Sequence, residues 1–102
     1  MTADTTGLLG LIRCDKVAGG YEGAGPIAGE TLPLQVRRIP NVTAIRVVIG
    51  DEEAEFYGNA ILEKSGNGYK GIGFIRRDGF PPADLRFEVR KSTARENAVE
   101  VS

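Results

Sequence analysis

Residues 55–76, EFYGNAILEKSGNGYKGIGFIR, decide the fold of this chain because they combine two apolar runs with a strong turn signal. The runs 55–64 and 69–76 flank the tetrapeptide SGNG at 65–68. An Asn-Gly step supplies the positive φ values that a tight hairpin turn requires. The stretch therefore predicts an antiparallel β-hairpin.

Apolar residues alternate with other residues in three further segments, 32–37, 45–49 and 85–90. Successive side chains of a strand point to opposite faces, so each segment predicts a half-buried antiparallel strand. No segment of a dozen residues carries apolar residues at helical spacing without a Gly or Pro inside it. The chain is therefore expected to be all-β, with a core made of Leu34, Val36, Ile45, Val47, Phe74, Phe87 and Val89.

The remaining segments are harder to place. Residues 8–16 predict a first strand, and 98–101 predict a short last strand or a frayed tail. Residues 18–26, AGGYEGAGP, are so rich in Gly that they predict a loop, either crossing between sheets or forming an exposed tip. This spacing of strands favours a sandwich or a small barrel, and no internal repeat is evident, which excludes solenoids and propellers. We expect one domain over 8–102, preceded by a flexible arm at 1–7.

Composition excludes several classes of function. The chain has 102 residues, 13 Lys+Arg, 14 Asp+Glu, one Cys and no His. Without His, histidine-based catalytic triads and most zinc sites are impossible within one chain, and we expect no enzyme and no cofactor. A net charge of −1 argues against nucleic acid as a partner. No run approaches the ~20 apolar residues that span a bilayer, and no basic, apolar leader precedes the domain, so we expect neither a membrane span nor an export signal.

Three local patterns invite a chemical interpretation, and each has a simpler structural one. Residues 66–71, GNGYKG, match G-x-G-x-x-G, but a strand follows where a dinucleotide-binding fold needs a helix. The acidic run at 51–55 lacks the calcium-loop pattern, so we expect a solvated turn, with cation binding left open. Cys14 has no histidine to activate it and is expected to be a small core residue.

Two arginine doublets, Arg37-Arg38 and Arg76-Arg77, each end a predicted strand. Adjacent residues of a strand face opposite sides, so at most one arginine of each doublet points into a shared patch. We expect these residues either to line a face that binds an acidic protein surface or to solubilise the outer faces.

The segment 66–91 resembles the closing strands of bacterial and phage immunoglobulin-like domains. It contains a Gly-Asn-Gly-Tyr turn, a strand at 70–75, the corner FPPAD at 80–84 and an alternating strand at 85–89. The resemblance implies an antiparallel immunoglobulin-like β-sandwich of about seven strands. It also implies a bacteriophage head decoration (cement) protein, made in the host cytoplasm, which binds the major capsid protein in the virion.

The alternative is an immunoglobulin-like adhesion module that binds carbohydrate or a receptor, and a small cytosolic enzyme or inhibitor is a third, less favoured option. Decoration predicts a protein partner and is compatible with a homo-oligomer on the assembly. The residues expected to contact the partner lie in the arm, the Gly-rich loop and the doublets: Thr2, Asp4, Thr5, Gly20, Tyr21, Glu22, Arg37, Arg38, Arg76 and Arg77.

The alternation at 85–89 places Phe87 in the core, and this placement is testable. Truncation of a buried Phe removes its transfer free energy and leaves a cavity, so Phe87→Ala is expected to lower the free energy of unfolding by roughly 3 to 5 kcal/mol. Urea denaturation followed by far-UV circular dichroism measures the loss. A helix-dominated spectrum would contradict the all-β prediction itself.

Overall fold

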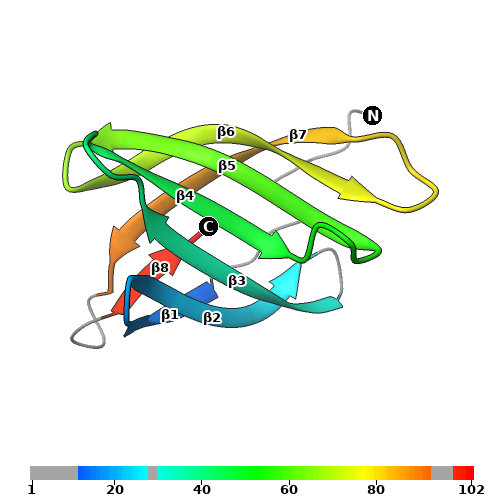
Figure 1. The fold of residues 1–102 in the computed structure, drawn as a ribbon, viewed down its shortest axis with the longest axis horizontal. Coiled ribbons are helices and arrows are strands. Elements are labelled where there is room, and N and C mark those ends of the chain that lie inside the picture. Colours follow the sequence, from blue (N-terminus) through cyan, green and yellow to red (C-terminus); the bar gives the residue numbers. More distant parts are fainter. Residues whose placement is uncertain (1–11, 28–29, 93–97) are drawn as a thin grey trace.

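A computed structural model describes residues 12–27, 30–92 and 98–102, and all of its regular structure is antiparallel β (Figure 1). The all-β prediction is therefore confirmed for these residues. Its strands are β1 (Ile12–Val17), β2 (Gly20–Ile27), β3 (Glu30–Arg38), β4 (Ala44–Gly50), β5 (Phe56–Ser65), β6 (Gly68–Arg77), β7 (Ala83–Lys91) and β8 (Ala98–Val101).

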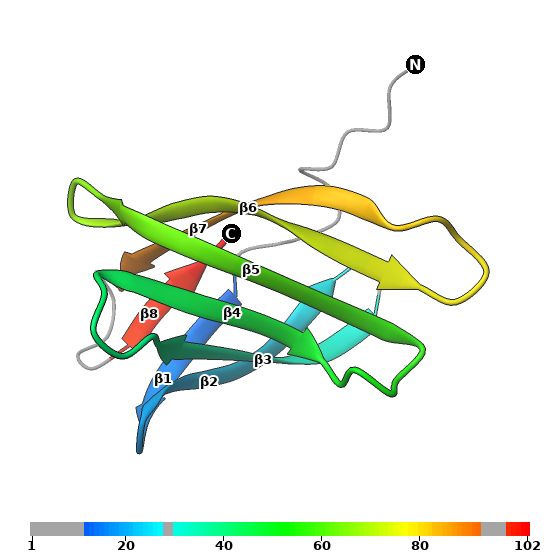
Figure 2. The same cartoon turned by 45° about the horizontal axis from the view of Figure 1, so that its top comes forward.

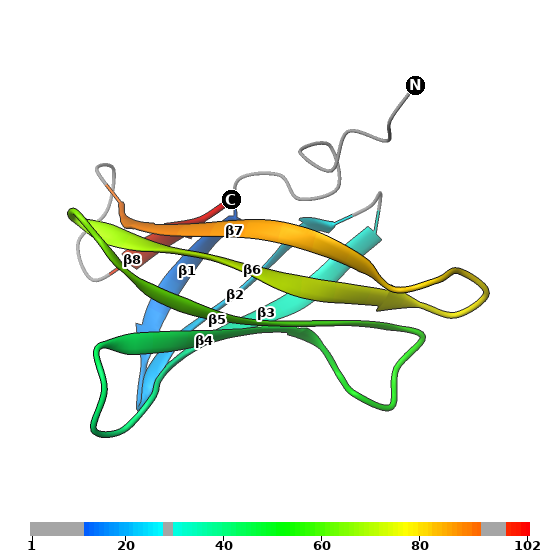
Figure 3. The same cartoon turned by 90° about the horizontal axis from the view of Figure 1, so that it is seen from above.

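The eight strands form one closed barrel in which every strand pairs with its sequence neighbours. β8 closes the barrel by pairing with β1, with Ile12 opposite Val101 and Cys14 opposite Val99. In Figures 2 and 3, β4–β7 form one wall, which crosses the wall of β8, β1, β2 and β3 at a steep angle. The predicted seven-strand immunoglobulin-like sandwich is wrong, because β1 and β8 hydrogen-bond to each other instead of leaving two separate sheets.

The hairpin that we predicted at 65–68 is confirmed, although its turn differs in detail. Ser65 pairs with Gly68, so Gly66 and Asn67 form a two-residue turn between β5 and β6. Gly66 has a φ of 59°, whereas Asn67 is not among the described residues with positive φ. A positive φ at the first central position alone is the signature of a type II′ turn, which requires Gly there.

The predicted loop at 18–26 is wrong, because residues 20–27 form strand β2. Gly19 lies in the turn before β2, with a φ of 85°, but the later glycines of this segment lie in the strand. Gly23 and Gly25 take the inward positions of β2, and a Cβ on Gly23 would lie 2.4 Å from the Arg13 carbonyl oxygen on β1. Gly71 and Gly73 do the same on β6. Glycine is needed at these positions because the strands curl too tightly for a second inward side chain.

The side chains that fill the barrel come from all eight strands, and the largest fully buried ones include Leu34, Ile49, Leu62 and Phe87. Six of the seven predicted core residues are buried. The exception is Phe74, which is 40% exposed. Alternation from Gly73 and Ile75, which face inward, places Phe74 on the outer surface.

The two halves of the barrel repeat each other, which corrects the expectation of no internal repeat. CDKVAGGYEGAGPI at 14–27 aligns with LEKSGNGYKGIGFI at 62–75, LPLQVRR at 32–38 with LRFEVRK at 85–91, and AIRV at 44–47 with AVEV at 98–101. Strand pairing follows the same correspondence. Tyr21 pairs with Val36 as Tyr69 pairs with Val89, and Val47 pairs with Ala60 as Val101 pairs with Ile12. β1–β4 and β5–β8 are therefore two copies of one four-strand unit, related by a pseudo-twofold axis along the barrel.

The inward glycines give a direct test of the fold. A Cβ on Gly73 would lie 2.2 Å from the Asn59 carbonyl oxygen and 2.4 Å from the Ala60 Cβ. Gly73→Ala is therefore expected to lower the free energy of unfolding by about 1 to 3 kcal/mol, as overpacking does. The control is Ile72→Val, on the outer face of the same strand, where the side chain is 62% exposed and its truncation should change the free energy of unfolding by less than about 0.5 kcal/mol. Equal urea midpoints for the two variants would contradict the tight curl.

Candidate functional site

The outer face of β5 and β6 carries three exposed apolar side chains. Ile61 is 52% exposed, Ile72 is 62% exposed and Phe74 is 40% exposed. The other large hydrophobic residues exposed in the described part of the chain are Val42 and Phe80, both in turns. We call Ile61, Ile72 and Phe74 the outer apolar strip.

Aromatic and polar contacts extend this strip towards the β4–β5 turn. The Phe74 ring lies 5.8 Å from the Tyr57 ring in a tilted arrangement, and the Arg76 guanidinium lies over Tyr57 at 5.6 Å. The Asn59 side-chain amide donates to the Tyr57 hydroxyl at 2.9 Å. These contacts hold the aromatic side chains in place.

Charged residues border the strip on both sides. Arg46 on β4 pairs with Ile61, Arg86 on β7 pairs with Ile72, and Asp84 pairs with Phe74. Arg46 and Arg86 are both exposed. An apolar centre with an arginine border is the composition that protein–protein interfaces favour.

The two halves of the barrel differ at this face. At the positions that correspond to Ile61 and Ile72, the first half has Arg13 and Ala24. Because both halves have the same strands and register, the fold does not require large apolar side chains there. The apolar strip therefore needs an explanation other than folding.

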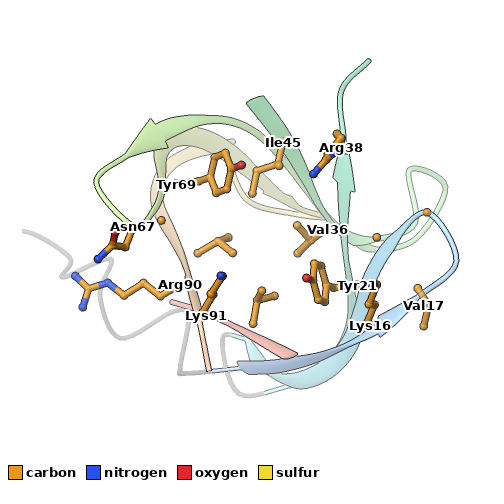
Figure 4. Close-up of a pocket in the computed structure, with 15 residues that line it drawn as sticks. Lys16, Val17, Tyr21, Val36, Arg38, Ile45, Asn67, Tyr69, Arg90 and Lys91 are labelled. Atoms are coloured by element: carbon orange, nitrogen blue, oxygen red, sulfur yellow. The ribbon is translucent and has the colours of Figure 1, made fainter. Parts of the chain in front are cut away.

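A cavity of about 520 Å³ opens at the barrel end where β1, β3, β5 and β7 finish (Figure 4). Its walls include Val36, Ile45, Val89 and Val99, and two tyrosines, Tyr21 and Tyr69. Its charged lining residues are all basic: Lys16, Arg38, Arg90 and Lys91. An adjoining hollow shares Asn67, Tyr69 and Lys91 and adds Lys64, Lys70 and Glu88.

The two arginine doublets do not form one patch, because β3 and β6 end at opposite ends of the barrel. Arg37 forms an ion pair with Glu22 at 2.7 Å, and Arg38 lines the cavity. Arg76 donates to the Glu52 carbonyl oxygen at 2.6 Å and so fastens the β4–β5 turn. Arg77 lies over the Phe80 ring at 4.9 Å.

The remaining predicted contact residues divide into two groups. Gly20 and Tyr21 lie in strand β2 and line the cavity, while Glu22 faces outward and holds Arg37. Thr2, Asp4 and Thr5 lie outside the described residues. Residues 51–55 are exposed, and no cluster of His, Cys, Asp or Glu suited to a metal ion occurs in 12–27, 30–92 or 98–102.

Sequence reasoning missed the outer apolar strip and most of the cavity. It placed Phe74 in the core and did not predict that Lys16, Tyr69 and Lys91 line one cavity. The internal repeat was the sequence signal that could have found the cavity residues. Tyr21 and Tyr69 each begin the pattern Y-x-G-x-G-x-I, and Arg38 and Lys91 each end a matching strand.

No protein-family model, curated protein or solved structure matches the chain. Among the described residues there is also no helix with the length and apolar character to cross a membrane.

Cys14 is fully buried, as predicted, and its reactivity gives a test of this placement. Burial, reinforced by the neighbouring Asp15 carboxylate, raises the pKa of the Cys14 thiol from 9.0 to about 11. At pH 8 the folded protein is expected to react with iodoacetamide at least about 100-fold more slowly than the protein in urea, because the thiolate is the nucleophile. Similar rates in both states would show an accessible thiol.

The same pKa shift predicts a loss of stability in alkali. Between pH 9 and pH 11 the unfolded state releases the thiol proton while the folded state keeps it. The contribution to stability is therefore complete below pH 9 and is lost as the pH rises through 11. Cys14→Ser provides the control, since it should remove this part of the alkaline dependence.

Proposed function

We propose that the protein is a non-enzymatic binding protein that docks the outer apolar strip on another protein. The observation that carries this proposal is the presence of Ile61, Ile72 and Phe74 on the outer face of one half of the barrel. Isolated exposed apolar residues are ordinary, but neighbouring ones on two paired strands favour an interaction site. The border of Arg46 and Arg86 adds a preference for a partner with carboxylates around an apolar patch.

We propose a phage capsid as the specific partner, with the protein decorating the coat lattice as a cement. The resemblance noted for residues 66–91 suggested this partner, and the outer apolar strip supplies a surface for it. Anything that binds the assembled shell and not its dissociated subunits raises the stability of the shell by mass action. The arginine border would orient the protein on an acidic coat surface more than it would add affinity.

The test compares Ile61→Arg with Val42→Arg. Both residues are more than half exposed, at 52% and 57%, but Val42 lies in the β3–β4 turn, away from the strip. Each variant should unfold within about 0.5 kcal/mol of the parent, because neither side chain is buried. The first half of the barrel already accepts Arg13 at the position equivalent to Ile61.

The measurement is the thermal stability of phage particles that have been stripped of the protein and then reconstituted. The parent protein and Val42→Arg should raise the temperature of particle disruption, and Ile61→Arg should not. Particles whose stability is unchanged by the parent protein would contradict capsid decoration. Binding of the parent to immobilised glycans, lost in Ile61→Arg, would favour the adhesion alternative instead.

A further inference from the structure

We propose that the cavity at the barrel end binds a small amphipathic anion, with an apolar body inside the barrel mouth and a carboxylate or phosphate group at its rim. This binding site is separate from the outer apolar strip and does not depend on it.

The inner part of the cavity suits an apolar body. Four buried side chains line it: Val36, Ile45, Val89 and Val99. Below them, Leu34, Val47, Leu62 and Phe87 are fully buried and fill the barrel, so a ligand reaches only this depth. Burial of apolar surface against these side chains supplies affinity without orienting the ligand.

Two tyrosines stand on opposite walls of the cavity. Tyr21 lies on β2 and Tyr69 on β6, four strands apart around the barrel, and both pack against the core. Figure 4 shows both side chains directed towards the cavity. Each ring offers an apolar face to a bound chain and a hydroxyl that can donate to an oxygen near the mouth.

Three cations surround the mouth from three different strands. Each cation stands two positions after a buried, inward-facing residue of its strand, so it continues the inward face. The three pairs are Cys14 and Lys16 on β1, Val36 and Arg38 on β3, and Val89 and Lys91 on β7. The ion pairs of the described residues, Arg37–Glu22 and Arg90–Glu88, do not use them. No carboxylate is among the residues that line the cavity. The mouth therefore attracts anions and repels cations.

The two halves of the barrel carry cations at the same inward positions, which supports a role for them in binding. The exposed inward cations occur in both halves, with Lys16 matching Lys64 and Arg38 matching Lys91. The outward residues of the same strands match only in part: Arg37 corresponds to Arg90, whereas Arg13 corresponds to Ile61. A barrel closes with any hydrophilic residue at its rim, so folding alone gives no reason to keep a positive charge at the same inward positions twice.

The probes are octanoate and octyl phosphate, with 1-octanol as the neutral counterpart and octylammonium as the cationic one. Each is titrated into the ¹⁵N-labelled protein and followed by amide chemical shifts. The two anions should bind in a saturable way and shift the amides of Gly20, Tyr21, Tyr69 and Lys91. Octanol and octylammonium should bind at least about tenfold more weakly, because they lack attraction to the rim.

Added salt and charge-removing variants then test whether the cations at the rim attract the anionic group. Raising the salt from about 20 mM to about 500 mM should weaken octanoate binding and leave octanol binding nearly unchanged, because salt screens exposed charges. Arg38→Gln combined with Lys91→Gln should weaken octanoate binding about tenfold or more. The control is Arg46→Gln combined with Arg86→Gln, which makes the same change of charge on the outer face and should leave octanoate binding unchanged.

All four substituted residues are exposed, so both double variants should keep the thermal midpoint of the parent. No saturable binding of either anion, equal affinity for octanol and octanoate, or equal weakening by both double variants would each overturn the proposal. Shifts confined to the amides of Ile61, Ile72 and Phe74 would also overturn it, because they would place the ligand on the outer apolar strip.

Discussion

The tight curl of the sheet at β2 and β6 is the constraint on which the rest of the structure depends. In a gently twisted antiparallel pair, directly opposed Cβ atoms lie about 4.5 to 5.5 Å apart. Here a Cβ on Gly73 would lie only 2.4 Å from the Ala60 Cβ, and one on Gly23 would lie 2.9 Å from the Cys14 sulfur. Only one side chain of each such pair fits inside. Glycine at the other position lets the eight strands close around a core of ordinary apolar residues.

Closure also follows from the duplicated unit. A single four-strand sheet would expose two edges, each with unpaired backbone donors and acceptors. Two copies satisfy both edges at once, because β4 pairs with β5 and β8 pairs with β1 in equivalent registers. The pseudo-twofold axis then runs through the barrel and its end cavity. For this reason, related residues such as Tyr21 and Tyr69 face each other across the mouth.

The sequence allowed the strand content, the β5–β6 hairpin and most of the core to be predicted, because these depend on local alternation and on one turn. It left a sandwich and a small barrel open, and the resemblance then favoured the sandwich, which the closed barrel contradicts. Gly23 and Gly25 indicated a loop when judged by backbone freedom alone, whereas the curl of the sheet requires them in a strand. Phe74 was misplaced for a related reason. Where glycine occupies the inward positions, the larger residues of that strand mark the outer face, which is the reverse of the usual pattern.

Comparison of the two halves separates what the fold requires from what it does not. Residues that close the barrel match between halves, as Gly23 and Gly71 do, and so do the inward residues at the cavity mouth. The outward residues Lys70, Ile72 and Phe74 on β6 do not match their counterparts on β2. Tyr69 and Phe74 lie on the same strand but on opposite sides of the barrel wall. Tyr69 shares the inward face with Gly71 and Gly73, whereas Phe74 lies on the outward face. Substitutions at the outer apolar strip therefore leave the cavity lining untouched, so the two proposed sites can be tested independently in one protein.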